Sequence, residues 1–301
     1  MSTETLCRLC RKETALRESH IIPKFAFRWI KETSATGNLR FSQTPNKRVQ
    51  DGEKPKLLCH RCEEFFSGFE TEFSSKVFYP YHKDNTIHLN YSIYLIKFST
   101  SLSWRVLTFF SERGLLNNFS QQEREIASRV CEHWRLFLLG DVPNLSDFEQ
   151  HLLPVSYISK VEGGDIALGM NYYLMRTTDM DCLHSSAGGL VMTKLPGFIF
   201  LGFMSKPSRK YWQGTKINLK GGKIEPREYK IPRGFGRYLN SKAENLHKAI
   251  SKLSPQQRGK IVKAYSRQSP DVLANSKTFE AISHDIELSG NSMFIREADD
   301  D

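Results

Sequence analysis

Two Cys-x-x-Cys pairs, separated by 48 residues, constrain the fold of this chain more than any other feature. Cys7 and Cys10 form the first pair, and Cys59 and Cys62 form the second. Each pair lets two thiolates from one tight turn reach the same ion, and four thiolates form the closed tetrahedral set of a structural zinc ion. We therefore predict a structural Zn²⁺ site joining the two segments. Four free cysteines are the alternative.

Charge is concentrated in two basic blocks. Residues 1–62 hold thirteen Lys or Arg against six Asp or Glu, and residues 205–237 hold ten against two, in a chain of net charge +10. Such blocks suit a polyanion, so DNA or RNA is the expected partner. Solvated basic faces without a partner are the alternative.

We expect neither a signal segment nor a membrane segment in this chain. The N-terminus, MSTETLCRLC, lacks the apolar stretch of a signal peptide. The longest apolar run, residues 195–204, is about half of the roughly 20 residues that a spanning helix needs. We expect a cytoplasmic protein without a membrane partner, in which paired cysteines bind metal and do not form disulfides.

The periodicity of apolar residues predicts an α+β fold in three parts. Residues 1–82 would form a zinc-bound domain, with one helix near 24–35 and a second that begins at the second cysteine pair and ends at 79–81. Residues 83–150 look helical, and Ser120 with Glu123 forms a capping-box pattern. Residues 151–301 would form a β-rich domain closed by helices, with a strand expected at 167–179.

The first 65 residues resemble the HNH family of treble-clef, or His-Me finger, endonucleases. The segments that carry the resemblance are CRLC, SHIIP and LLCHRCEE. The resemblance implies a ββα treble clef held by zinc and an activity that hydrolyses nucleic-acid phosphodiesters. It also implies that His20 is the general base and that a divalent ion, Mg²⁺ or Mn²⁺, assists.

The sequence departs from the family pattern at three places. Ser19 stands where a metal ligand usually precedes the histidine, the expected Asn before the second cysteine pair is missing, and Glu63 replaces the last histidine. Carboxylates suit a hard cation, so we expect Glu18, Asp51 and Glu63 to supply the ion's oxygen ligands. The alternatives are a packed His20 and a Glu63 that only complements a helix N-terminus.

Five residues are candidates for contacting nucleic acid. They are Lys24, Arg48, Arg209, Lys210 and Trp212. The last three lie in a segment where basic and aromatic residues alternate, which fits contact with a phosphate backbone and stacking of a base. The rim of a β-hairpin would have the same composition.

A second functional hypothesis needs no catalysis. The loss of two of the three HNH motif residues favours a zinc-structured nucleic-acid-binding or adaptor protein. Its C-terminal part would then contact nucleic acid, a protein partner or a second copy of the chain. Cleavage, or its absence, distinguishes the two hypotheses.

Overall fold

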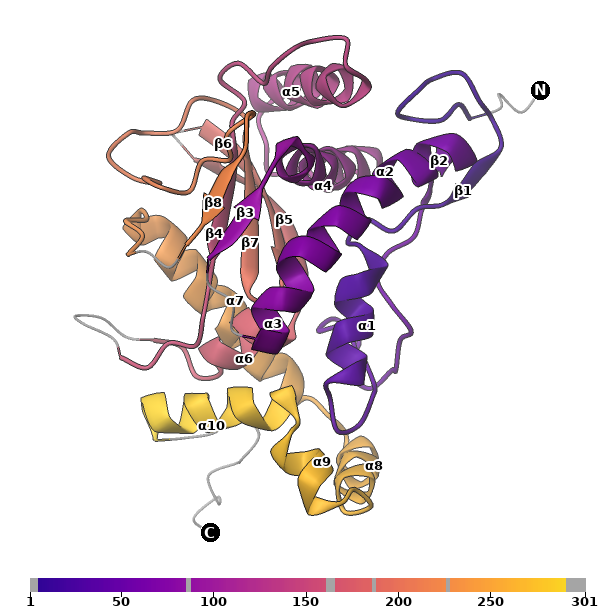
Figure 1. Cartoon of the computed structure of the whole chain (residues 1–301). Coiled ribbons are helices and arrows are strands. Elements are labelled where there is room, and N and C mark those ends of the chain that lie inside the picture. The colour runs from indigo at the N-terminus through magenta and orange to yellow at the C-terminus, as the bar shows by residue number, and fades with distance from the viewer. Residues whose placement is uncertain (1–4, 85–87, 161–165, 186–187, 226–227, 291–301) are drawn as a thin grey trace.

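The protein is described by a computed structural model that covers residues 5–84, 88–160, 166–185, 188–225 and 228–290. Its described part combines helices with a four-stranded antiparallel sheet and two short strand pairs, which confirms the α+β class (Figure 1). The helices are α1 (Lys24–Glu32), α2 (His60–Phe73), the π-helical turn η1 (Ser74–Phe78), α3 (Tyr79–Asp84), α4 (Ile93–Glu112), α5 (Gln121–Leu139), α6 (Met170–Arg176), α7 (Arg233–Ser251), α8 (Pro255–Tyr265), α9 (Pro270–Ala274) and α10 (Lys277–Ser289). The strands are β1 (Leu16–Glu18), β2 (Lys56–Cys59), β3 (Leu89–Tyr91), β4 (Gln150–Pro154), β5 (Asp179–Ser185), β6 (Gly188–Leu195), β7 (Phe198–Phe203) and β8 (Gly222–Ile224).

The four-stranded sheet, in the order β4-β7-β6-β5, is covered on both faces. Phe198 and Phe200 of β7 pack into a core with α4 and α5, whereas Ile199 and Leu201 pack into a second core with α6 and α7. Successive side chains of a strand point to opposite faces, so a strand covered twice is apolar throughout. This explains the apolar run at 195–204. No helix in the described ranges is long and apolar enough to cross a membrane.

Helix α4 is the central helix of the molecule. Fifteen of its twenty residues are buried, because it lies between the sheet, α2 and α5 (Figure 1). Gly202 of β7 permits this approach, since a Cβ there would lie 2.4 Å from Ser103 Oγ of α4. The ammonium group of Lys97 donates to the carbonyls of Phe137 and Leu138, where α5 ends. A cation at that end satisfies unpaired carbonyls.

Helix α5 begins at the capping box that the sequence predicts. The N–H of Glu123 donates to Ser120 Oγ at 3.3 Å, and the Glu123 carboxylate accepts from the Ser120 N–H at 2.7 Å. These two bonds form the capping box. Gly140 ends the helix with a left-handed φ of 89°.

The first strand pair joins the two cysteine segments. β1 and β2 are antiparallel, with Leu16 opposite Cys59. Helix α1, which confirms the helix expected near 24–35, packs its aromatic face against α2 and η1. Phe25 lies 6.0 Å from Phe73 and 5.0 Å from Phe78, measured between ring centroids.

The helix after the second cysteine pair is longer than predicted. It does not end at 79–81 but continues through η1 into α3, with Pro80 as the second residue of α3. Proline lacks an N–H and is tolerated in the first turn of a helix. The π-helical turn interrupts the regular hydrogen-bond ladder, so α3 starts afresh and Pro80 falls in its first turn.

The strand expected at 167–179 is wrong, because Met170–Arg176 form helix α6. Asp285 of α10 accepts hydrogen bonds from the N–H groups of Asn171 at 2.8 Å and Tyr172 at 3.0 Å. A carboxylate at a helix N-terminus pairs with donors that otherwise lack partners. This cap comes from more than a hundred residues away, so a local sequence pattern could not reveal it.

The three predicted parts share one hydrophobic core. It contains Cys7 and Phe73 from the first part, Trp104 from the second and Phe200 from the third. The divisions at 82 and 150 therefore cut through this core, whereas the buried residues of the second core all lie within residues 151–301.

Two buried histidines should make the fold sensitive to acid. Burial lowers the pKa of His82 to about 3 and that of His151 to about 4. An unfolded histidine has a pKa of about 6.5. The stabilisation is therefore complete above pH 6.5 and is lost as the pH falls toward these folded values, by about 1.4 kcal/mol per pH unit for each histidine.

Urea unfolding between pH 7.5 and 4.5 measures this loss. In His82→Gln we expect the dependence of the unfolding free energy on pH to be shallower by about 1.4 kcal/mol per unit. His88→Gln is the control, because His88 is exposed. An unchanged dependence in His82→Gln would show that His82 is protonated within the fold.

Candidate functional site

The four cysteines of the two pairs form one cluster. The sulfur atoms of Cys7, Cys10, Cys59 and Cys62 all lie within 4.8 Å of one another, and those of Cys10 and Cys59 are 3.9 Å apart. Ligands at about 2.3 Å from a tetrahedral zinc ion are separated by about 3.8 Å. The spacing is too long for a disulfide and fits four ligands of one ion, so the cluster is compatible with a structural metal such as zinc.

Local backbone geometry brings each pair of thiols to the cluster. In the first pair, the N–H of Arg11 donates to the carbonyl of Cys7 at 2.8 Å, and Arg11 has a left-handed φ of 57°. In the second pair, Cys59 ends β2 and precedes α2, and Cys62 lies in the first turn of that helix. The positive end of the helix dipole therefore faces the thiols, which favours their thiolate form.

The thiols of the cluster differ in their acidity. Burial raises the pKa of Cys59 to about 11 and moves that of Cys62 well above its ordinary value. Burial acts the same way on Cys10, but the backbone N–H groups of Lys12 and Glu13 outweigh it and lower the pKa to about 7. Crowded, buried thiols resist ionisation unless a cation compensates, as a bound metal ion does.

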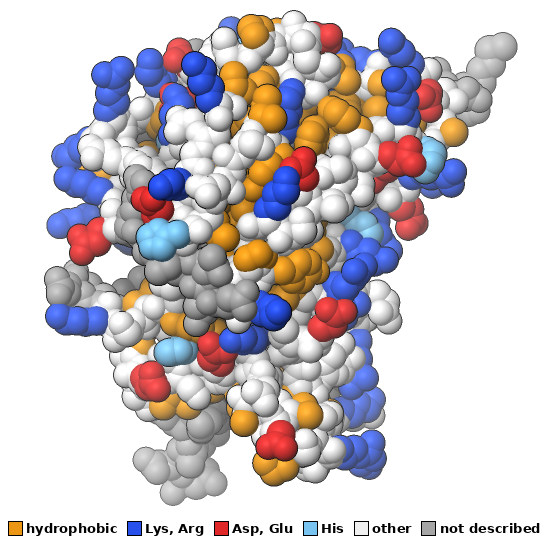
Figure 2. All heavy atoms as spheres, viewed as in Figure 1, with side chains coloured by type: hydrophobic (Ala, Val, Ile, Leu, Met, Phe, Trp, Pro, Cys, Tyr) orange, Lys and Arg blue, Asp and Glu red, His pale blue; other side chains and the backbone are white. Residues whose placement is uncertain are grey.

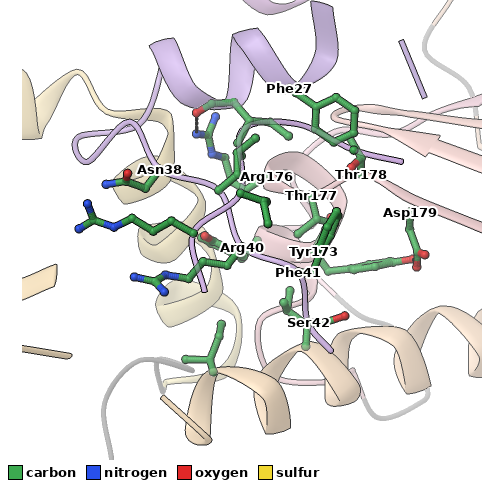
Figure 3. Close-up of a pocket in the computed structure, with 18 of the residues that line it drawn as sticks. Phe27, Asn38, Arg40, Phe41, Ser42, Tyr173, Arg176, Thr177, Thr178 and Asp179 are labelled. Carbon is green, nitrogen blue, oxygen red and sulfur yellow. Dashed lines mark hydrogen bonds between the residues drawn. The ribbon is translucent and has the colours of Figure 1, made fainter. Parts of the chain in front are cut away.

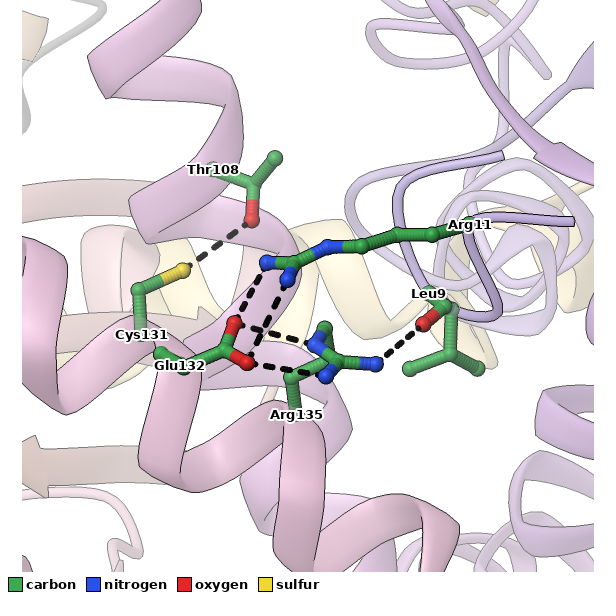
Figure 4. Close-up of polar contacts among 6 residues, drawn as sticks. All are labelled: Leu9, Arg11, Thr108, Cys131, Glu132 and Arg135. Carbon is green, nitrogen blue, oxygen red and sulfur yellow. Dashed lines mark hydrogen bonds and ion pairs between the residues drawn. The ribbon is translucent and has the colours of Figure 1, made fainter. Parts of the chain in front are cut away.

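Three charged side chains fasten the first cysteine pair to α5. Glu132 accepts from both terminal nitrogens of Arg11 and from Arg135, at 2.9 Å and 2.8 Å for Arg135 (Figure 4). Arg135 also donates to the carbonyl of Leu9, between the two cysteines, at 2.9 Å. Bidentate arginine–carboxylate pairs fix geometry as well as charge. The turn that carries Cys7 and Cys10 is thus held against the helical core.

His20 forms a hydrogen-bonded pair with Asp51. His20 Nε2 lies 3.0 Å from Asp51 Oδ2, and the two side chains are 21% and 14% exposed. Burial alone would raise the pKa of Asp51, but hydrogen bonds from His20 and Lys54 outweigh it and lower that pKa. Lys54 lies 3.2 Å from Asp51 and 3.9 Å from Glu18, which is largely exposed. His20 is therefore oriented by a carboxylate and still open to solvent.

Glu63 lies behind His20, beside a buried arginine. Arg105 of α4 is 2% exposed, and its Nη1 donates to the His20 carbonyl at 2.8 Å and to Glu70 at 2.7 Å. Burial raises the pKa of Glu63, and the Ser19 hydroxyl and the Arg105 guanidinium offset part of that shift. Glu63 Oε1 has no hydrogen-bond partner among the described residues. Arg105 thus compensates the negative charge of this acidic pair.

The residues expected to hold a divalent ion do not converge as one ligand set. Within the described ranges, the cysteine cluster is the group of His, Cys, Asp and Glu whose ligand atoms come close enough to share an ion. Asp51 faces His20 and Lys54, whereas Glu63 faces Ser19 and Arg105. The structure therefore brings together His20 and Asp51 but not the full set with Glu18 and Glu63.

Most of the predicted nucleic-acid contacts are exposed cations. Lys24 at the start of α1, Arg48, Arg209 and Lys210 are all exposed. Lysine and arginine side chains gather along the edge formed by α1 and α8 and over the loop that follows β7 (Figure 2). This distribution fits the expectation of basic surfaces. Such a surface can bind a polyanion or can be solvated without a partner.

Trp212 does not fit the stacking role expected for it. Its side chain is 6% exposed and packs edge-on against Phe203 and Phe235 in the core shared with α7. A buried ring has no free face for a base. The aromatic residue in this basic segment is therefore a core residue.

Sequence analysis missed Arg105 and Lys54, which complete the surroundings of His20. Arg105 lies 85 residues beyond His20, and their contact depends on how α4 packs. The available clue was a charged residue within an otherwise apolar helix, because buried arginines are nearly always paired. No comparable clue marked Lys54, one of many lysines in a polar connection.

No family model, curated protein or solved structure matches this chain.

Proposed function

We propose that the chain is a zinc-structured nuclease that hydrolyses nucleic-acid phosphodiesters with His20 as general base. The observation that carries the proposal is the His20–Asp51 pair, in which a partly exposed imidazole is held at 3.0 Å by a carboxylate. A general base that a second group orients is the usual arrangement for removing a proton from a nucleophile.

The order of elements around the cysteine cluster supports this proposal. The first cysteine pair, the β1–β2 pair and α2 with the second cysteine pair come in the order of a treble clef, with α1 inserted between β1 and β2. His20 lies just beyond β1, the place where the HNH resemblance puts its base. In this proposal Zn²⁺ binds the four cysteines and joins β1, β2 and α2.

The proton transfer follows from the hydrogen bond between the pair. Asp51, as a carboxylate, only accepts, so Nε2 of His20 carries the hydrogen and Nδ1 keeps its lone pair. Nδ1 then takes a proton from water while the water oxygen bonds to phosphorus. The bond from phosphorus to the leaving oxygen breaks, and that oxygen takes a proton from solvent.

A divalent ion is not part of this proposed step. Glu18, Asp51 and Glu63 do not form a shared ligand set in the described part of the chain, so these residues do not fit an Mg²⁺ or Mn²⁺ site as they stand. Lys54 lies 3.2 Å from Asp51, and Lys24, four residues beyond His20 in the sequence, is exposed. Their positive charge attracts a phosphate backbone.

Replacing His20 with alanine tests the proposal. We expect cleavage of labelled single- and double-stranded DNA and RNA to fall by about 10²- to 10⁴-fold, the usual contribution of a general base. Asp51→Asn should also lower the rate, because an amide does not stabilise the imidazolium. Assays run with Mg²⁺, with Mn²⁺ and with a chelator that leaves the zinc bound.

His88→Ala is the matched control, because His88 is exposed and lies outside the site. Zinc content and melting temperature should stay unchanged in His20→Ala, since the imidazole bonds only to Asp51 among the described residues. A wild-type protein that cleaves no nucleic acid under any of these conditions contradicts the nuclease proposal.

One observation favours a second candidate, a nucleic-acid-binding or adaptor protein without catalysis. The guanidinium of Arg105 pairs with Glu70 at 2.7 Å and offsets part of the burial-driven rise in the pKa of Glu63, so its charge compensates carboxylates on α2. Under this proposal the wild-type protein binds labelled nucleic acid without cutting it, and salt weakens the binding. Cleavage by the wild-type protein, or binding without cleavage, therefore separates the two candidates.

A further inference from the structure

A large hollow lies between the first part of the chain and the C-terminal helices. Its volume is about 1520 Å³, and its walls come from α1, the segment 36–53, α6, α7, α8 and α10. Figure 3 shows Arg40 and Asn38 on one side of it and Tyr173 and Asp179 on the other. Ordinary small-molecule sites measure roughly 300–1,000 Å³. The hollow is therefore large enough for a long ligand.

Apolar side chains form most of the wall. They come from every wall element, and include Ile30 of α1, Phe41, Leu246 of α7, Ile261 of α8 and Ile282 of α10. Burying an apolar group against such a surface is favourable by about 25 cal/mol per Å² of apolar area removed from water. The body of a fitting ligand is therefore apolar.

A buried arginine borders this apolar space. Arg176 is 3% exposed, and its two Nη groups donate to Thr33 Oγ1 and to the Ile30 carbonyl, both at 2.7 Å. Its Nε is buried without a hydrogen-bond partner among the described residues. Burial lowers the pKa of Arg176 and the negative charge of Glu280 on α10 raises it by less, but the ion pair of Glu280 is with Lys277 at 2.7 Å. A buried cation with a free donor favours an anion beside it.

Three further arginines, Arg40, Arg48 and Arg258, line the hollow, and none of them has an ion pair among the described residues. Arg40 donates to the Pro45 carbonyl and to the Gln257 amide oxygen, and burial and the charge of Arg48 lower its pKa. Arg48 is exposed. Across the described ranges, no carboxylate lies within 4.0 Å of the guanidinium of Arg40, Arg48 or Arg176. The lining also holds the carboxylates Asp51, Glu53 and Asp179, of which Asp51 pairs with His20 and Lys54, and Asp179 with Lys242. The hollow thus combines apolar walls with guanidinium groups that have no carboxylate partner within 4.0 Å.

We propose that this hollow binds an amphipathic anion, a long apolar chain that ends in a carboxylate or a phosphate. The head group would pair with guanidinium groups at the wall, where bidentate contacts to either oxyanion are available. The chain would lie along the apolar wall. Asp51, the partner of His20, also lines this hollow, so its wall borders the proposed hydrolytic site. Binding of the amphipathic anion does not depend on hydrolysis of nucleic acid.

Isothermal titration calorimetry with four probes tests the ligand class. Dodecanoate and dodecyl phosphate, kept below their micellar concentrations, carry the proposed head groups. Dodecyltrimethylammonium has the same chain with a cationic head, and AMP has a phosphate without the chain. We expect binding of one or both anionic dodecyl probes and at least about tenfold weaker binding of the other two, because both charge and chain contribute.

Two variants test the place of binding without removing Arg176, which also holds the end of α1. Arg48→Gln should weaken binding of the anionic probe about tenfold, the effect of one charged contact of about 1.4 kcal/mol. Ala264→Phe, which fills space at the α8 wall, should weaken it at least as much. Arg267→Gln is the matched control, an exposed arginine just beyond α8 that does not line the hollow.

Three results would overturn the proposal. They are no binding of either anionic dodecyl probe, equal or tighter binding of the cationic probe or AMP, and anion binding that neither Arg48→Gln nor Ala264→Phe weakens. The difference between dodecanoate and dodecyl phosphate shows which head group the arginines prefer.

Discussion

Replacing Cys59 with serine should release the metal and unfold the segment that the two cysteine pairs hold together. Cys59 is fully buried, ends β2 and lies 3.9 Å from Cys10 in the cluster. Structural zinc sites contribute about 10–16 kcal/mol of apparent binding free energy. A whole domain is stable by only about 5–15 kcal/mol. Loss of one ligand, and of the metal ion with it, would therefore remove more free energy than the segment has in excess over its unfolded state.

Metal content by mass spectrometry and the melting temperature of the purified variant measure this effect. We expect about one zinc ion per wild-type chain, none in Cys59→Ser, and loss of the β1–β2 signals in amide hydrogen exchange. Cys131→Ser is the matched control, because Cys131 lies outside the cluster and bonds to Thr108 at 3.4 Å. A wild-type chain whose four thiols all react under native conditions would refute the metal site.

Replacing Arg105 with leucine should be the most destabilising change outside the cluster. Its guanidinium is buried, donates to Glu70 at 2.7 Å and holds the His20 carbonyl at 2.8 Å. Removing one member of a buried ion pair leaves the other charge uncompensated and costs about 3–5 kcal/mol. The cost rises here because Glu63 loses a nearby cation as well.

Denaturant unfolding of Arg105→Leu, Glu70→Leu and the double variant separates charge from packing. The double variant should recover much of the stability lost in Arg105→Leu, since an apolar pair can replace a buried ion pair. Lys76→Leu is the control, because its ion pair with Glu72 on the same helical run is exposed. A double variant that is no more stable than Arg105→Leu would show that Arg105 does not stabilise the fold through its ion pair with Glu70.

Local patterns in the sequence were sufficient for the elements whose determinants are local. The capping box of α5 lies within Ser120 and Glu123, and the cysteine cluster follows from two short motifs whose ligand chemistry is specific. The fold class follows likewise from the periods of the apolar residues. In each case the decisive residues are within a few positions of one another or share one chemical requirement.

Features that depend on distant contacts could not be predicted. Helix α6 is capped by Asp285 of α10, and Trp212 is covered by α7, so both were assigned by local composition alone. The pair of His20 with Asp51 was expected only as part of a larger ligand set, since no pattern shows that Arg105 sits beside Glu63. Which groups meet across a core is a property of packing.

The shared core around α4 limits how the cysteine-bearing segment can be reused. Phe66 and Phe73 of α2 pack directly on Trp104 and Phe98 of α4, and α4 in turn covers the sheet. The segment that carries the four cysteines could therefore not be grafted onto another scaffold by those cysteines alone. A protein that receives this segment must also supply an apolar helix that packs against α2 as α4 does. Transfer of the segment to another protein would therefore require α2 and α4 to be transferred together.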